Sequence, residues 1–188
     1  MNLPHGTRPG TALVTGALGF VGRWLVTELQ EHDREVVGAD LSPEAAAFPY
    51  LPLDLTDGPT VAAAVDELRP ATVFHLAAQS SAAASFADPA GTFAANLQGT
   101  LNLLEAVRAL PAAERPVILA VGSCEEYGPQ PGEPSPLDES TPLNPVSPYA
   151  VSKAAQTLLC RQYAASWGLH VVVCLLYTSD AADDASSV

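Results

Sequence analysis

The stretch that decides the fold reads Thr11-Ala12-Leu13-Val14-Thr15-Gly16-Ala17-Leu18-Gly19-Phe20-Val21-Gly22. Its first five residues are mostly apolar or β-branched and predict a buried strand, and an apolar helical pattern follows the last glycine. A strand, a glycine loop and a helix in this order are typical of a phosphate-binding turn. Gly16 permits the tight turn, Gly19 lets the backbone approach a pyrophosphate, and Gly22 allows the helix to pack closely on the strand. The helix N-terminus adds free N–H groups for the anion. A plain tight turn carries similar glycines, so this interpretation depends on the rest of the chain.

An acidic residue follows at the spacing that such a turn requires. Residues 35–40 predict a second strand, and Asp40 at its end lies eighteen residues beyond Gly22. A carboxylate at this position binds the 2′-hydroxyl of an adenosine ribose and repels a 2′-phosphate, which favours NAD over NADP. Arg23 would offset part of that repulsion, so NADP remains possible. The alternative is a solvated aspartate at a strand end.

Strands and helices alternate along the remaining chain. Further strands are predicted over 50–55, 72–76 and 117–121 and from 170 onward, with helices over 58–68, 89–110 and 148–167. This order predicts an α/β fold with a doubly wound parallel sheet of the Rossmann type and right-handed crossovers. Ligands bind such sheets at the carboxyl ends of the strands, where Gly16, Asp40, Ala77 and Ser123 are expected to gather. His75 lies inside a strand and is interpreted as a packed core histidine rather than a catalyst.

The segment Ser147-Pro148-Tyr149-Ala150-Val151-Ser152-Lys153 predicts a helix start that carries an acid–base pair. Ser147 is a suitable N-cap and Pro148 suits the first turn. Tyr149 and Lys153 are four residues apart and therefore share one helix face. An ammonium beside a phenol stabilises the phenolate and lowers the phenol pKa, which makes a usable general acid–base. Lys153 is the only lysine, against seven arginines, as expected where a compact ammonium is needed. A chance Tyr/Lys pair is the alternative.

Composition limits the class of protein. With 188 residues, 48% hydrophobic and 15% charged, the chain has enough apolar residues for one globular domain with a real core. The net charge of −13 argues against nucleic acid or an anionic membrane as partner. No apolar run has the length of a membrane span or of a signal-peptide core. Three cysteines, Cys124, Cys160 and Cys174, show neither metal-ligand spacing nor a paired framework, so we expect no metal and a cytoplasmic location.

Taken together, Gly16-x-x-Gly19-x-x-Gly22, an isolated Ser123 and Tyr149-x-x-x-Lys153 resemble the extended short-chain dehydrogenase/reductase family. The closer resemblance is to its NAD-dependent epimerase/dehydratase branch, which acts on nucleotide sugars. Residues 75–81, 123–128 and 147–156 are particularly similar to GDP-mannose 4,6-dehydratases and GDP-4-keto-6-deoxymannose reductases. The resemblance covers residues 11 to about 173.

The resemblance also implies roles for individual residues. Tyr149 would exchange a proton with a sugar hydroxyl or ketone, Lys153 would hold the nicotinamide ribose, and Ser123 would hydrogen-bond the same sugar oxygen. The implied cofactor contacts are Gly16, Gly19, Phe20, Val21, Gly22, Asp40, Asp54, Leu55, Leu76, Ala77, Ala78, Tyr149 and Lys153. The implied substrate contacts are Ser80, Ser81, Asn96 and Ser123.

Glu125 decides between the activities that the resemblance implies. In the dehydratases a Thr-x-Glu pattern supplies a glutamate that removes the C5 proton, so that water leaves from C6. This chain keeps Glu125 but has Ser123 in place of the threonine, which fits the Ser-x-Glu-Glu-Tyr-Gly form of the reductases better. We therefore expect a GDP-4-keto-6-deoxymannose reductase, with a GDP-mannose 4,6-dehydratase or a nucleotide-sugar 4-epimerase as alternatives. A non-catalytic dinucleotide-binding module is the alternative from another class, and the intact acid–base set argues against it.

The chain departs from the family after Val173. The family continues there into an Arg-Pro-rich turn and a substrate-binding domain. This chain reads Cys-Leu-Leu-Tyr-Thr-Ser-Asp-Ala-Ala-Asp-Asp over 174–184 and stops at Val188. That string resembles the translated read-through of an adapter from DNA sequencing libraries, and a short natural acidic tail is the alternative.

These observations predict the organisation of the chain. We expect an N-terminal tail over 1–10, an NAD(P)-binding Rossmann domain over 11–173 and a non-native tail over 174–188. The domain is then truncated before its C-terminal substrate domain, and this fragment is expected to have little or no turnover. The full-length protein is expected to form a homodimer through residues 89–110 and 148–167, as the resemblance implies.

Overall fold

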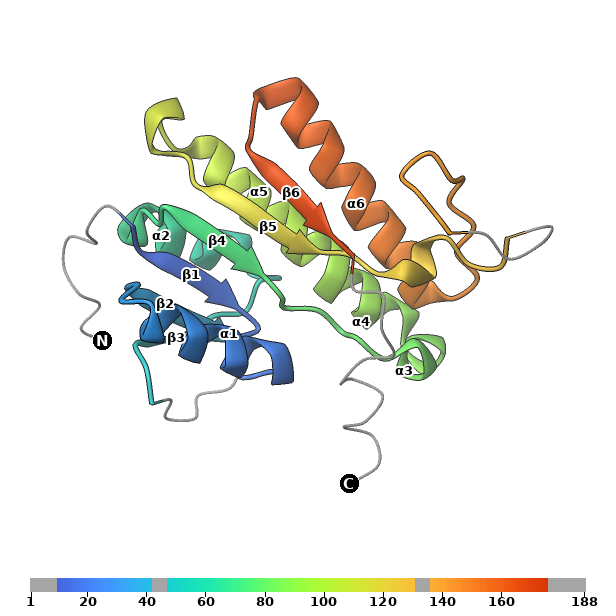
Figure 1. Cartoon of the computed structure of the whole chain (residues 1–188), viewed down its shortest axis with the longest axis horizontal. Helices are drawn as coiled ribbons and strands as arrows, with labels where there is room; N and C mark the ends of the chain where they lie inside the picture. Colours follow the sequence, from blue (N-terminus) through green and yellow to red (C-terminus); the bar gives the residue numbers. More distant parts are fainter. Residues whose placement is uncertain (1–9, 42–46, 131–135, 176–188) are drawn as a thin grey trace.

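The computed structural model describes residues 10–41, 47–130 and 136–175. Six strands form one parallel sheet in the order β3-β2-β1-β4-β5-β6 (Figure 1). This order is that of a Rossmann fold and confirms the predicted doubly wound sheet. The strands are β1 (Ala12–Thr15), β2 (Val36–Asp40), β3 (Tyr50–Pro52), β4 (Thr72–His75), β5 (Val117–Val121) and β6 (Val171–Cys174).

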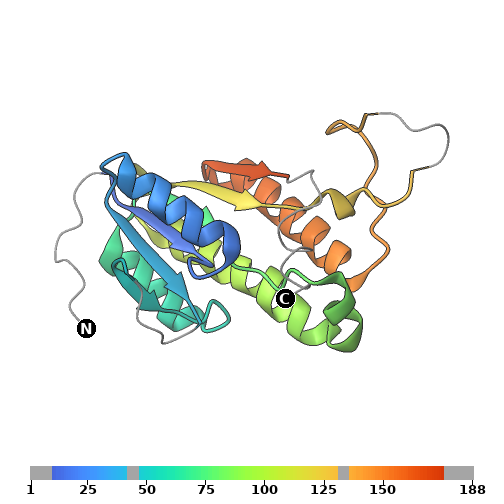
Figure 2. The same ribbon diagram turned by 60° about the horizontal axis from the view of Figure 1, so that its bottom comes forward.

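Alternating side chains of the strands feed two apolar layers on opposite faces of the sheet. Leu13 of β1 packs into the larger layer with α2 (Gly58–Leu68), α5 (Gly99–Ala109) and α6 (Pro148–Trp167). Its neighbours on β1 pack into the smaller layer with α1 (Phe20–Glu31). In Figure 1, α5 and α6 lie behind β5 and β6, and Figure 2 shows the same layers from another side. The larger part of the apolar core therefore lies between the sheet and the helices α2, α5 and α6.

The other face of β5 and β6 is open to solvent. Val117 is 47% exposed and Val172 is 54% exposed, although both lie in strands. Their neighbours Ile118, Val171 and Val173 point the opposite way, into the larger apolar layer. Within the described part of the chain, no helix covers Val117 and Val172.

Helix boundaries follow local chemistry. The side chains of Asp57 and Ser147 cap α2 and α6, each followed by a proline in the first turn, and Gly168 ends α6 in the left-handed conformation. These two helices were predicted with the bounds that are observed. The helix predicted over 89–110 is three consecutive segments, α4 (Pro89–Phe93), a π-helical turn η1 (Ala94–Gln98) and α5.

Other boundaries differ from the prediction. A short helix α3 (Ala82–Ala87) precedes α4 and was not predicted. Strand β3 ends at Pro52, earlier than expected. Strand β6 covers Val171–Cys174, where a strand was predicted from 170 onward. Residues 1–9 of the predicted N-terminal tail and 176–188 of the predicted non-native tail lie outside the described residues.

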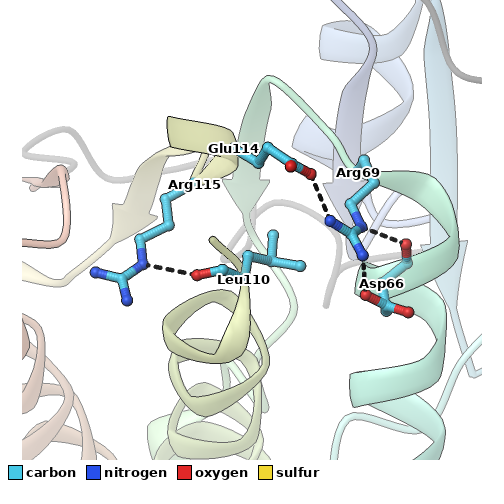
Figure 3. A network of polar contacts seen from close by, with 5 residues as sticks. All are labelled: Asp66, Arg69, Leu110, Glu114 and Arg115. Atoms are coloured by element: carbon cyan, nitrogen blue, oxygen red, sulfur yellow. Dashed lines mark hydrogen bonds and ion pairs between the residues drawn. The ribbon is translucent and has the colours of Figure 1, made fainter. Parts of the chain in front are cut away.

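A polar network closes the end of the molecule where β5 begins (Figure 3). Arg69 ends α2 with a positive φ of 43°, and its guanidinium pairs with Asp66 and with Glu114 of the 3₁₀ turn η2 (Ala112–Glu114). Arg115 donates to the carbonyl of Leu110 at 3.2 Å and to that of the last residue of α6 at 3.1 Å. Exposed ion pairs contribute at most about 1 kcal/mol each, so this network mainly sets helix ends.

Two glycines offer a matched test of what the loop after β5 requires. Gly128 and Gly168 have φ values of +51° and +66°, but an added Cβ meets the Asn144 carbonyl oxygen at 1.9 Å only at Gly128. Gly168→Ala should cost roughly 1–2 kcal/mol of unfolding free energy through backbone strain alone. Gly128→Ala should cost clearly more, because the backbone at Asn144 must move as well. Urea denaturation of both variants checks this expectation, and equal losses would contradict it.

Candidate active site

The glycine turn after β1 leaves no room for side chains. Gly16 has a φ of +71°, and an added Cβ would lie 2.7 Å from the backbone nitrogen of Ala77. At Gly22 an added Cβ would lie 2.1 Å from the carbonyl oxygen of Gly16. The backbone of β1 therefore approaches both α1 and the segment after β4, as a phosphate-binding turn requires. Gly19, Phe20 and Val21 are exposed where α1 begins.

Asp40 holds this turn from the end of β2. Its Oδ2 accepts a hydrogen bond from the backbone nitrogen of Leu18 at 3.0 Å, and its Oδ1 accepts from that of Leu41 at 2.8 Å. A carboxylate has about four lone-pair sites, so these two bonds leave capacity for a ribose hydroxyl. Contact with a ribose stays a prediction.

The other predicted cofactor residues lie at the same end of the sheet. Asp54 follows β3, is exposed and accepts from the backbone nitrogen and hydroxyl of Thr56, while Leu55 beside it is buried. Leu76, Ala77 and Ala78 follow β4 and are half-buried. The structure thus places these predicted cofactor residues in the segments that follow the carboxyl ends of β1, β2, β3 and β4.

Lys153 is buried beside the end of β5. Its side chain is 3% exposed, and its ammonium donates to the carbonyl of Val121 at 2.7 Å and to Oε1 of Gln156 at 2.8 Å. Burial lowers the lysine pKa to about 8, while the charge of Glu126 acts in the opposite direction. An ammonium has three N–H donors. Two have partners among the described residues, so one remains for an oxygen of a ligand.

The backbone of Tyr149 is fixed from both sides on the first turn of α6. Its nitrogen donates to Oγ of Ser85 on α3 at 3.1 Å, and its carbonyl accepts from Oγ of Ser152 at 2.7 Å. The Tyr149 residue is 8% exposed. Ser147 caps the helix by accepting from the nitrogen of Ala150 at 3.0 Å. Tyr149 and Lys153 therefore sit on successive turns of a helix that is fixed where it begins.

Asn96 anchors the same helix from the π-helical turn. It is fully buried, and its Nδ2 donates to Oγ of Ser152 at 2.9 Å and to the carbonyl of Gln79 at 3.0 Å. Its Oδ1 accepts from the nitrogen of Gln79 at 2.7 Å. These bonds fit a residue that shapes the site from inside. Ser80 and Ser81 are exposed, and the hydroxyl of Ser81 caps α3.

Ser123 and Glu125 reach the site from the loop after β5. Ser123 caps the 3₁₀ turn η3 (Cys124–Glu126), where its hydroxyl accepts from the nitrogen of Glu125 at 3.3 Å. Glu125 is exposed, and its Oε2 lies 3.5 Å from Oγ of Ser147, the residue that caps α6. Glu125 therefore lies at the start of the helix that carries Tyr149, and Ser123 is its hydrogen-bonded neighbour in η3.

His75 is a core histidine, as predicted. It is 2% exposed, with Nδ1 at 2.8 Å from Oγ1 of Thr15 and Nε2 at 2.9 Å from Oγ1 of Thr100. Because Thr100 donates its own proton to the carbonyl of Asn96, it accepts from His75, which places the proton on Nε2. Burial, and then the charge of Lys153, lower the His75 pKa to about 3. The ring is therefore neutral and links β1, β4 and α5.

Two further polar residues of the site were not predicted. Gln156 is 2% exposed and accepts from Lys153, and Glu126 is 1% exposed beneath Ser123. The sequence signal that could have revealed them is a long polar side chain among mostly small or apolar neighbours. Their burial depends on contacts between η3 and α6 that no local pattern reveals. Among the described residues there is no group of three metal-ligating side chains, and no helix could cross a bilayer.

Fold and site together define a class: a Rossmann-type α/β domain with a Ser, Tyr and Lys set where β5 and α6 meet. The model of the NAD dependent epimerase/dehydratase family matches residues 12–179, and the chain belongs to that family.

Individual relatives carry several activities. A GDP-mannose 4,6-dehydratase of Sordaria araneosa is 34% identical, over 92% of this chain and 33% of the relative. A GDP-6-deoxy-D-mannose reductase of Pseudomonas aeruginosa is 35% identical, over 85% of this chain and 49% of the relative. The structure of a UDP-glucose 4-epimerase of Thermus thermophilus in complex with NAD superposes with a TM-score of 0.77 at 36% identity, over 87% of this chain and 53% of that one. The chain thus spans a third to a half of the length of these curated relatives.

The neutral His75 predicts how stability depends on pH. The unfolded histidine binds a proton below about pH 6.5, whereas the folded one does so only near pH 3, so the unfolded state binds more protons in between. The unfolding free energy should therefore fall by about 2 kcal/mol from pH 7 to pH 5 through this residue. His75→Gln should lack that part of the loss.

Urea denaturation at the two pH values measures this effect. His170→Gln removes an exposed histidine and serves as the control; it should retain the full pH dependence. A His75→Gln variant that loses as much stability as the unaltered chain would contradict the assignment.

Proposed function

We propose that the protein is an NAD(P)-dependent enzyme that modifies a nucleotide sugar, and that its reaction is the reduction of a 4-keto group on a GDP-sugar. The observation that carries the proposal is the buried Lys153 ammonium, which keeps one donor for a ligand while Val121 and Gln156 hold the other two. A domain that only binds a dinucleotide has no need for a buried lysine beside Tyr149 and Ser123. The family membership supports the same reading.

The residues at the glycine turn fit a dinucleotide. A side chain at Gly16 or Gly22 would collide with neighbouring backbone, so the tight turn requires glycine at both positions. The N-terminus of α1, a helix of 12 residues, lies at this turn and offers free N–H groups to a phosphate. Asp40 favours NAD over NADP, and the Thermus thermophilus relative was crystallised with NAD. In its reduced form, NAD(P)H, this cofactor would supply the hydride for the sugar C4 carbon and would be oxidised to NAD(P)⁺.

The chain's own residues supply the proton. In the proposed reaction Tyr149 gives its phenolic proton to the keto oxygen as that oxygen becomes a hydroxyl. Ser123 donates a hydrogen bond to the same oxygen and orients it. Lys153 holds the cofactor ribose through its remaining donor, and its positive charge favours the phenolate that Tyr149 leaves behind. Asn96 fixes the helix that carries both residues.

A dehydratase is the second candidate, and Glu125 favours it. This carboxylate is exposed beside the start of α6, two residues beyond Ser123, where a base for a sugar C5 proton would be needed. The Sordaria araneosa relative carries that activity in its name. The serine in place of threonine before Glu125 supports the reductase instead.

The remaining alternatives place fewer demands on these residues. A 4-epimerase needs no base at Glu125, and a non-catalytic dinucleotide-binding module needs neither Glu125 nor the Ser123, Tyr149 and Lys153 set. In the full-length protein, residues 89–110 and 148–167 are proposed to form a homodimer.

Tyr149→Phe in the full-length gene product tests the acid–base role. We expect turnover of GDP-4-keto-6-deoxymannose to fall by about 10²–10⁴-fold, because a positioned proton donor contributes that much. NAD affinity, measured by calorimetry, should remain within a few-fold. Unchanged turnover would refute the role of Tyr149.

Glu125→Gln separates the candidate reactions. A reductase or an epimerase should keep most of its activity, because neither removes a C5 proton. A dehydratase should lose nearly all conversion of GDP-mannose. Parallel assays of the variant and the unaltered enzyme with both GDP-sugars give the answer. Conversion of GDP-mannose by the unaltered enzyme that Glu125→Gln abolishes would overturn the reductase.

A further inference from the structure

Glu126 joins the loop after β5 to the helix that carries the acid–base pair. Its carboxylate Oε1 accepts a hydrogen bond from the backbone nitrogen of Ser123 at 3.0 Å. The same oxygen accepts from the hydroxyl of Thr157 on α6, also at 3.0 Å. The side chain is 1% exposed, which is unusual for a glutamate. One buried oxygen thus connects Ser123 with the helix of Tyr149 and Lys153.

The surrounding backbone leaves space for this carboxylate. At Gly122 an added Cβ would lie 2.7 Å from Oε1 of Glu126 and 2.5 Å from Cδ2 of Leu175. The nitrogen of Asn144, shortly before α6 begins, donates to the carbonyl of Glu126 at 3.0 Å. Glu126 therefore holds two segments: its side chain holds Ser123 after β5, and its backbone holds Asn144 before α6.

Glu126 also acts on Lys153 through its charge. Burial raises the Glu126 pKa, while the Ser123 and Thr157 hydrogen bonds and the lysine charge lower it. In return, the carboxylate charge favours the lysine ammonium. The other titratable groups near Lys153 are Tyr149 and Cys160 on α6 and the neutral His75 on β4. The remaining titratable groups on the elements packed against α6 are Cys124, Glu125, Glu105, Arg108 and Cys174; of these, Glu105 and Arg108 pair with each other.

We propose that Glu126 is a positioning residue of the active site, whose buried carboxylate fixes Ser123 relative to Thr157 on α6, one turn beyond Lys153. This inference rests on the proposed function, because it assigns Glu126 to the same acid–base set. Glu126 would act on the reaction only through Ser123 and the residues of α6. Glu126 itself is buried beneath the loop and touches no substrate.

The titration of Lys153 tests the charge effect without any turnover. Lys153 is the only lysine in the chain, so biosynthetic ¹³C-lysine labelling gives one side-chain signal by NMR. Glu126→Gln keeps the size and the acceptor oxygen but removes the charge. Its Lys153 midpoint should fall below that of the unaltered chain by about half a pH unit or more. Glu125→Gln removes an exposed charge from the same turn and should leave the midpoint nearly unchanged.

Thr157 variants test the tie to α6 with the charge retained. Thr157→Val should leave the Lys153 midpoint in place but lower kcat about five- to tenfold in the full-length enzyme, the value of one hydrogen bond. Thr157→Ser keeps the hydroxyl and should restore turnover. In Glu126→Gln, the alkaline limb of the kcat profile should move to lower pH together with the Lys153 midpoint.

The outcomes separate this inference from the proposed function. Equal Lys153 midpoints in Glu126→Gln and the unaltered chain, in samples with the same thermal unfolding, overturn the role of Glu126 even if the enzyme is active. A shifted midpoint in a protein that turns over no nucleotide sugar supports the coupling and overturns the proposed function. Full activity of Thr157→Val overturns the claim that the hydrogen bond between Thr157 and Glu126 positions the site.

Discussion

The ammonium of Lys153 is buried against the end of β5. The arrangement of the site follows from its need for hydrogen-bond acceptors and for a compensating negative charge. A buried charge without partners costs several kcal/mol, so each of its neighbours is constrained. The carbonyl of Val121 turns toward it, Gln156 offers its amide oxygen, and the carboxylate of Glu126 supplies the opposite charge. These requirements fix α6 against the carboxyl ends of the strands. The tyrosine one turn earlier is thereby placed where ligands bind such a sheet.

The glycine turn after β1 and the residues of α6 are linked at the point where the strand order reverses. β1 and β4 are neighbours, and there Gly16 approaches the backbone of Ala77 so closely that only a glycine fits. From the same pair of strands a line of buried hydrogen bonds runs through Thr15, His75 and Thr100 to the backbone of Asn96. The Asn96 amide then holds Ser152 on α6. The glycine turn and α6 are thus connected by one continuous line of buried hydrogen bonds.

The sequence predicted the parts whose causes are local. The ends of α6 were predictable because Ser147 and Pro148 begin a helix and Gly168 ends one, and the core role of His75 followed from its place inside a strand. α3 was missed because Ala82–Ala87 is too short to show an apolar period. The π-helical turn was missed because i to i+5 bonding has no sequence signature. Glu126 and Gln156 were missed because their burial depends on residues some thirty positions away along the chain. The roles of Ser123, Tyr149 and the cofactor residues remain predictions.

The central claim is that Tyr149 and Lys153 serve the transfer of a hydride between a nicotinamide cofactor and the C4 carbon of a nucleotide sugar. The most direct measurement uses the full-length gene product with GDP-4-keto-6-deoxymannose and NADH that carries deuterium in place of both hydrogens at the nicotinamide C4 position. Mass spectrometry of the sugar product then locates the label. The account predicts one deuterium at C4 of the reduced sugar. Conversion without label at that carbon, or no conversion of this or any related nucleotide sugar, would contradict it.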